Sequence, residues 1–145
     1  MTRRPFLLAL ALNLAAAASH AWAQQPNKIP VVGVLMMISA PDDPIVGALR
    51  QGLRDLGYVE GRNINIEFRT ALGHADRLPG LAEELVRLKA DVIFAAATPA
   101  IEAVKRATST IPIVMALGGD PVASGFVASL AKPGGNVTGL SSMSA

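Results

Sequence analysis

The sequence has no cysteine, little histidine and few aromatic residues. Without cysteine, its 145 residues can form no disulfide, thiolate zinc site, iron–sulfur cluster or cysteine nucleophile. Only His20 and His74 carry imidazoles. The phosphate-binding patterns G-x-x-x-x-G-K-[ST] and G-x-G-x-x-G and the hydrolase pattern G-x-S-x-G are absent as well. The sequence therefore predicts no catalytic residue, no metal site and no cofactor, and we do not expect an enzyme.

Charged residues are also scarce, at 17%, whereas hydrophobic residues make up 51%. This composition is too apolar for a disordered chain, and the length is too short for two ordinary domains. The apolar excess has two sources, which are packed secondary-structure elements and a membrane-directed segment at the N-terminus.

The first 23 residues have the pattern of a secretory signal peptide. Arg3 and Arg4 form a basic start, residues 6–18 are rich in Leu and Ala, and an Ala-Trp-Ala sequence ends at Ala23. The apolar run is shorter than the ~20 residues that a membrane-spanning helix needs. We predict cleavage after Ala23 and a periplasmic product, residues 24–145. The paired arginines also resemble the twin-arginine signature, but the pattern favours the general secretion route.

Removal of this signal changes the charge balance. Loss of Arg3 and Arg4 lowers the number of basic residues from 13 to the same 11 as the acidic ones, so the formal net charge falls from +2 to zero. Nucleic-acid binding requires a surplus of Lys and Arg on one face. The remaining chain is therefore not expected to have a nucleic-acid partner.

The rest of the sequence alternates between short apolar runs and amphipathic segments. The first run contains no polar alternation, which predicts a strand buried on both faces, whereas the second alternates and fits a sheet edge. The predicted strands are residues 29–37, 64–69, 92–96, 113–117 and 137–140. Apolar residues at helical spacing predict helices over residues 45–56, 77–88, 99–107 and 121–130. Gly57 stands where the left-handed residue that ends a helix belongs.

Strands separated by amphipathic helices predict an α/β fold. Right-handed crossovers place such strands in a doubly wound parallel sheet with helices on both faces. We expect the strand order 2-1-3-4-5, because the amphipathic second strand fits an edge. Ligands of such sheets bind outside the carboxyl ends of the strands. The loops of interest are residues 38–43, 97–99 and 118–121.

Each of these loops carries a helix-capping residue followed by proline. Asp43-Pro44, Thr98-Pro99 and Asp120-Pro121 are all suited to the start of a helix. Three helix N-termini at one edge would favour an anionic group such as a carboxylate. The same dipeptides also occur at ordinary helix starts, so the ligand-site interpretation and the purely structural one both stay open.

Other candidate residues have simpler interpretations. His74 is expected in a solvated loop rather than as a catalytic base. Met36 and Met37 at the end of the first strand are suited either to an adaptable apolar pocket or to core packing. Asp42-Asp43 and Glu83-Glu84 fit a helix cap and a solvated helix face, so neither supports an acid–base pair.

Several segments in a fixed order resemble the extracytoplasmic substrate-binding proteins of ABC importers. The resemblance is strongest to the branch with tryptophan- and phenylalanine-binding members, and it spans nearly all of the chain after the signal. The matching segments are residues 48–64 (ALRQGLRDLGYVEGRNI), 76–79 (DRLP), 98–100 (TPA), 111–114 (IPIV), 120–122 (DPV) and 131–139 (AKPGGNVTG).

This resemblance implies a type I periplasmic-binding-protein fold, in which two lobes close on a ligand across a hinge. The sequence then holds the N-terminal lobe, residues 24–145, with the second lobe absent, so we expect weak or no ligand binding by this chain alone.

The implied function is binding without chemistry. An amino acid or similar carboxylate-bearing solute would lie in the cleft between the lobes, and the closed protein would dock on an ABC permease in the membrane. Backbone donors near Thr98 and Asp120 would face the anion, although Asp120 is better suited to capping than to binding a ligand ammonium. The expected ligand-binding residues are Met37, Ile38, Ser39, Ala97, Thr98, Pro99, Gly119 and Asp120.

Two other functions remain open at the level of sequence. An exported sensor or interaction lobe would present a surface to a membrane partner. An exported α/β enzyme is the weaker alternative, because the candidate acids and hydroxyls at the strand ends have no histidine partner.

Overall fold

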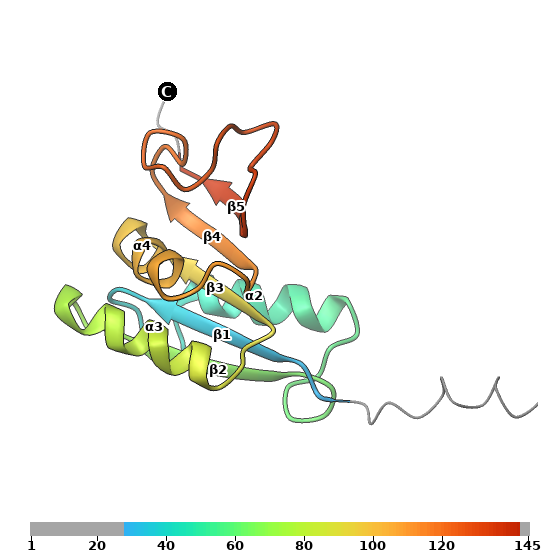
Figure 1. Ribbon diagram of the computed structural model, residues 1–145. Coiled ribbons are helices and arrows are strands. Elements are labelled where there is room, and N and C mark those ends of the chain that lie inside the picture. The colour runs from blue at the N-terminus through green and yellow to red at the C-terminus, as the bar shows by residue number, and fades with distance from the viewer. Residues whose placement is uncertain (1–27, 143–145) are drawn as a thin grey trace, which may run out of the picture.

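The structure, a computed structural model, describes residues 28–142. Five strands form one parallel sheet in the order β2-β1-β3-β4-β5, which confirms the predicted fold and strand order (Figure 1). The predicted signal peptide and its cleavage site lie outside the described residues. The strands are β1 (Val31–Met36), β2 (Asn65–Thr70), β3 (Val92–Ala96), β4 (Ile113–Gly118) and β5 (Val137–Ser141).

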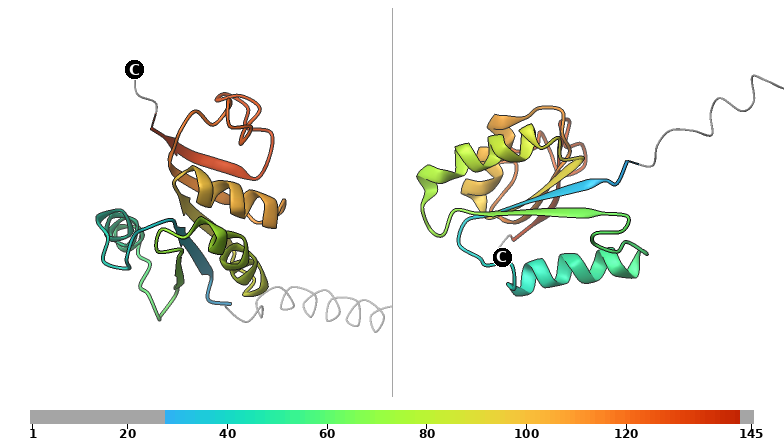
Figure 2. Two further views of the ribbon diagram at one scale, coloured as in Figure 1. Left: turned by 90° about the vertical axis from the view of Figure 1, so that its left-hand side faces the viewer. Right: turned by 90° about the horizontal axis from the view of Figure 1, so that it is seen from below.

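Helices cover both faces of the sheet. The helical elements are α2 (Pro44–Asp55), the 3-10 turn η1 (Ala75–Arg77), α3 (Leu78–Arg87) and α4 (Thr98–Ala107). Helices α3 and α4 pack side by side on one face, and α2 lies alone on the opposite face (Figures 1 and 2). Among residues 28–142, no helix has the length and apolar character needed to cross a membrane.

This arrangement produces two apolar cores, one on each side of the sheet. The core beneath α3 and α4 includes Leu35, Leu85 and Ile101, which are fully buried. The core beneath α2 is built around Val34 and Val46. Burying each such side chain stabilises the fold by roughly 1.5–3 kcal/mol relative to exposure. Strand β1 contributes to both cores, as its uninterrupted apolar sequence predicts.

Helix α2 ends as the sequence predicts. Gly57 adopts a left-handed φ of 87°. The N–H of Gly57 donates to the Arg54 carbonyl and the N–H of Tyr58 to the Leu53 carbonyl, which is the Schellman pattern. The apolar spacing predicts Leu56 on the buried face of this helix, but its side chain is 76% exposed. The helical periodicity fails there because the chain has already left the helix.

The predicted helix over residues 121–130 is wrong, because this segment forms a series of turns. One helical turn begins, with the N–H of Ser124 donating to the Asp120 carbonyl, but Gly125 then takes a left-handed φ of 68°. Glycine is a weak helix former and is free to reverse the chain at this point. The apolar spacing predicts Val122, Phe126 and Leu130 on the buried face of this helix. Phe126 is buried, whereas Val122 and Leu130 are 42% and 62% exposed.

Candidate functional site

The carboxyl ends of three strands surround an apolar hollow. This hollow has a volume of about 160 Å³. Four residues expected at the ligand site, Met37, Ile38, Ser39 and Ala97, line it together. The full lining consists of Met36, Met37, Ile38, Ser39, Ile45, Ala96, Ala97 and Leu117. Met36 is buried and Met37 half-buried, so the core and pocket interpretations of this pair both hold.

The other expected residues, Thr98, Pro99, Gly119 and Asp120, lie beside this hollow without lining it. Thr98 was expected to cap α4, but the helix already includes it, and Ala97 occupies the N-cap position. The Thr98 Oγ1 instead accepts a hydrogen bond of 3.4 Å from the N–H of Gly119. Thr98 therefore joins the start of α4 to the loop that follows β4. Pro99 is exposed on the first turn of α4.

Two aspartates at this edge use their carboxylates for capping. The Asp43 Oδ1 accepts from the Ile45 N–H at 2.8 Å and caps α2, as predicted. The Asp120 Oδ1 accepts from the N–H groups of Val122 and Ala123 at 2.9 and 3.1 Å, so it caps a turn rather than a helix. Of the three helix starts expected at this edge, two are therefore present, those of α2 and α4.

The capping bonds decide which backbone donors remain for a ligand. At α2, Pro44 has no N–H and the N–H of Ile45 is bonded to Asp43. At α4, Pro99 has none, and the N–H groups of Ala100 and Ile101 donate to the Ala97 carbonyl. The N–H of Thr98 is the donor that the first turn of α4 can offer to an anion.

Strained backbone marks the same edge of the sheet. Leu72, Ala97 and Leu117 have φ values of 54°, 73° and 52°, a region that side chains with a Cβ seldom occupy. These residues lie at the carboxyl ends of β2, β3 and β4, and such strain clusters at functional sites. The sequence predicted neither these conformations nor a role for Leu117. No residue type signals them, because leucine and alanine ordinarily avoid this region.

The site has the character of a binding surface. The residues that line the hollow include no charged side chain, and their one side-chain hydroxyl belongs to Ser39. His74 is exposed and its side chain makes no capping bond. Within residues 28–142, no group of three or more acidic or imidazole side chains could hold a metal ion. The arrangement is therefore suited to holding an apolar group beside the backbone N–H of Thr98.

The fold and the site define a doubly wound α/β lobe with an apolar site at its strand ends. The family model for ABC transporter substrate binding proteins matches residues 31–145. The chain therefore belongs to the ABC transporter substrate-binding protein family, as the sequence resemblance implied. The lobe has the type I periplasmic-binding-protein fold.

Relatives and solved structures agree with this assignment. A tyrosine-binding protein of Clostridioides difficile is 39% identical over 111 residues, which cover 76% of this chain and 32% of that protein. An ABC domain from Streptococcus pneumonia, solved in complex with L-Trp, matches with a TM-score of 0.73 and 34% identity. That match covers 79% of this chain and 39% of the other.

A second structure matches equally well. The ligand-free, open form of a substrate-binding protein with adhesive properties from Clostridium difficile gives a TM-score of 0.72 at 34% identity, covering 81% of this chain and 40% of that one. The chain thus spans about a third to two fifths of the length of the proteins it matches. These family members are substrate-binding proteins, and amino-acid binding is found among them.

Proposed function

We propose that this protein is the extracytoplasmic solute-binding component of an ABC importer. Its ligand is a small carboxylate-bearing solute, an amino acid with an aromatic or other apolar side chain. The single observation that carries this proposal is the apolar hollow at the strand ends, lined by residues from β1, β3 and β4, in a chain whose relatives bind tyrosine and tryptophan.

The hollow is suited to the side chain of such an amino acid. Met36 and Met37 present thioethers, which pack well against aromatic rings, and Ile38 and Leu117 add exposed apolar surface. The N–H of Thr98 at the start of α4 would face the ligand carboxylate. The Asp43 and Asp120 carboxylates cap backbone N–H groups through Oδ1 alone, so the second oxygen of each is free to accept from a ligand ammonium.

The remaining parts of the proposal concern the whole transport system. Residues 1–23 direct export and are removed after Ala23, and residues 24–145 act in the periplasm as the N-terminal lobe. A second lobe supplies the other wall of the cleft, and the closed protein docks on a membrane permease. Family membership supports this arrangement. Because a cleft with one wall leaves the ligand largely exposed to water, this lobe alone should bind weakly.

A nuclear magnetic resonance titration tests the ligand site. We expect L-tryptophan at millimolar concentration to shift the amide resonances of residues 37–39 and 97–98 in the ¹⁵N-labelled protein. Tryptamine, which lacks the carboxylate, should shift residues 37–39 but not Thr98. Absence of any shift in both loops would contradict the proposed site. Submillimolar binding would contradict the proposal that this lobe forms only one wall of the cleft.

A further inference from the structure

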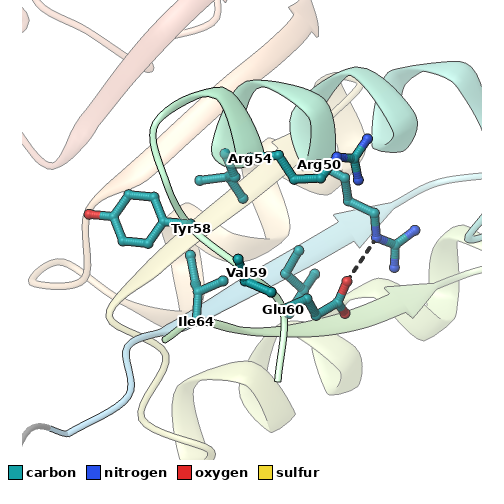
Figure 3. Close-up of a pocket in the computed structure, with 8 residues that line it drawn as sticks. Arg50, Arg54, Tyr58, Val59, Glu60 and Ile64 are labelled. Carbon is teal, nitrogen blue, oxygen red and sulfur yellow. Dashed lines mark hydrogen bonds and ion pairs between the residues drawn. The ribbon is translucent and has the colours of Figure 1, made fainter. Parts of the chain in front are cut away.

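A second pocket lies beside the C-terminal half of α2, away from the proposed ligand site. It has a volume of about 240 Å³ and is bounded by α2, the loop of residues 57–64 and the start of β2 (Figure 3). Leu53 and Ile64 form part of its apolar lining. Arg50 reaches from the helix across one side of the pocket toward Glu60 in the loop (Figure 3).

Arg50 connects the two loops that flank α2 in the sequence. Its Nη1 donates to the Pro41 carbonyl at 2.7 Å, and its Nε forms an ion pair of 3.3 Å with the Glu60 Oε2. Pro41 belongs to the loop between β1 and α2, whereas Glu60 belongs to the loop between α2 and β2. The planar guanidinium can hold both partners at once because its N–H groups point in fixed, different directions.

The loop held at Pro41 is the one that lines the proposed ligand site. Residues 38–43 join β1 to α2, and Ile38 and Ser39 contribute to the apolar hollow. Two hydrogen bonds hold this loop near its ends: the Met37 carbonyl accepts from the Gly73 N–H at 2.8 Å, and the Asp43 carboxylate caps α2. Arg50 supplies a side-chain anchor for its middle.

We propose that Arg50 is a positioning residue for the ligand site. By holding the Pro41 carbonyl, it keeps the preceding residues in the conformation in which they face the hollow, and Glu60 orients the guanidinium for this task. Proline fixes its own φ, so an anchored Pro41 restricts the direction from which the chain approaches it. Arg50 itself does not line the hollow. This inference rests on the proposed function, since it concerns the same site.

The test compares Arg50→Ala with Arg54→Ala. Arg54 lies one turn further along the same helix, but its Nη2 donates to the Gln51 Oε1 within the helix at 2.6 Å, so it anchors no loop. Arg50→Ala should raise the L-tryptophan concentration for half-maximal shift about three- to tenfold, because an unanchored loop must be ordered on binding. It should also speed hydrogen exchange at Asp43 while leaving β3 unchanged. Arg54→Ala should change neither the L-tryptophan concentration for half-maximal shift nor the hydrogen exchange at Asp43.

Two further variants separate positioning from general loss of structure. Arg50→Lys can keep one of the two contacts. Its affinity for L-tryptophan should therefore lie between those of the unsubstituted protein and Arg50→Ala. Glu60→Gln leaves Arg50 in place but removes the charge that orients it, so it should weaken binding by a smaller factor. Since Glu60 is 46% exposed, this variant is expected to fold even if Arg50→Ala does not.

The outcomes distinguish this inference from the proposed function. If the unsubstituted protein binds L-tryptophan at the hollow and Arg50→Ala binds equally well, the positioning role is overturned and the ligand site stands. Equal weakening by Arg50→Ala and Arg54→Ala would also overturn it, because a change in helix charge would then explain both. If the unsubstituted protein shows no shift at the hollow, the proposed function itself fails.

Discussion

At the scale of single residues, the two helix starts beside the hollow are built differently: Asp43 caps α2 with its side chain, whereas α4 begins at a left-handed Ala97 without a side-chain cap. Asp43 before Pro44 correctly predicted the start of α2, because the dipeptide alone satisfies a helix N-terminus. The same logic placed the cap of α4 one residue too late, at Thr98. Ala97 takes that position with a φ of 73°, a conformation that tertiary packing at the strand end must impose. Half of the expected site residues nevertheless line the hollow.

The Thr98 hydroxyl should contribute to stability through its hydrogen bond with Gly119. Thr98→Val keeps the shape of the side chain but removes the acceptor, so the half-buried Gly119 N–H loses its partner. We expect the free energy of unfolding to fall by about 1 kcal/mol in urea denaturation followed by circular dichroism. Thr98→Ser retains the hydroxyl, so the free energy of unfolding of this variant should fall by less. Equal losses of stability in Thr98→Val and Thr98→Ser would show that the hydrogen bond between Gly119 and Thr98 does not contribute to stability.

Gly139 should be intolerant of any side chain. It pairs with Met115 where the register between β4 and β5 shifts, and its φ is 130°. A Cβ on Gly139 would collide with the backbone of Met115, including a contact of 2.7 Å to its nitrogen. Gly139→Ala should therefore lower the free energy of unfolding by about 2 kcal/mol or more.

Gly135 in the preceding loop supplies the control for Gly139. Nothing lies within 4 Å of a Cβ placed on it, so Gly135→Ala should change the stability little. Thermal unfolding of Gly139→Ala and Gly135→Ala compares the stability of the two variants. A Gly139→Ala protein as stable as the control would show that the strands can shift to make room at little cost.

Asp91 should make the stability depend on pH in the acid range. Its carboxylate accepts from the Lys28 Nζ and from the Val31 N–H, both at 2.8 Å, and these bonds lower its pKa from the ordinary value. Because the pKa is lower in the folded state, the stabilisation is present above the unfolded pKa of about 4. It is lost as the pH falls through the folded pKa.

Asp91→Asn removes this titration. The free-energy difference between the unsubstituted protein and Asp91→Asn should be largest near neutral pH and should shrink below about pH 4. The effect is modest because both partners are largely exposed, with 63% exposure for Lys28 and 40% for Asp91. Urea titrations at a series of pH values provide the measurement. A free-energy difference between the two proteins that stays constant with pH would contradict the lowered pKa assigned to Asp91.

At the scale of elements, short apolar runs predicted the strands of the sheet, and helical periodicity predicted the three helices that pack against it. Core contacts reinforce the pattern of these helices, as with Leu78 and Leu85 of α3, which are both buried. The helix expected over residues 121–130 shows the limit of this reasoning. Its apolar spacing is helical, but Gly125 allows the chain to turn, and Phe126 can still be buried from a non-helical backbone. Local apolar spacing alone does not decide between these outcomes.

Two glycines of one helix should respond to alanine in opposite ways. Gly52 is exposed in the interior of α2, and a methyl group added there would meet nothing within 4 Å, so Gly52→Ala should raise the stability by about 0.5–1 kcal/mol. Gly57 ends the same helix with a φ of 87°, so Gly57→Ala should lower the stability by about 1 kcal/mol. Thermal unfolding monitored by circular dichroism compares the two. A change in stability of the same sign in Gly52→Ala and Gly57→Ala would contradict the assigned end of α2.

At the scale of the whole molecule, the strand order followed from two observations on single strands. The first strand is apolar on both faces and suits the interior of the sheet, whereas the alternating second strand suits an edge. The order then places the carboxyl ends of β1 and β3 side by side, and the hollow lies there. Its shape was not predictable, because it depends on left-handed residues such as Ala97 and Leu117 that the sequence does not reveal.

A chimera tests whether this hollow is one wall of a binding cleft. Residues 28–142 would replace the corresponding lobe of the tryptophan-bound relative, which this chain matches with a TM-score of 0.73. A ligand held between two walls loses most of its contact with water, so the chimera should bind L-tryptophan at least about a hundredfold more tightly than this lobe alone. Isothermal titration calorimetry measures both affinities. Ile38→Asp in the chimera should abolish the gain, because it places an unpaired charge in the apolar hollow. A folded chimera that binds no more tightly than the lobe, or that tolerates this substitution, would place the ligand elsewhere.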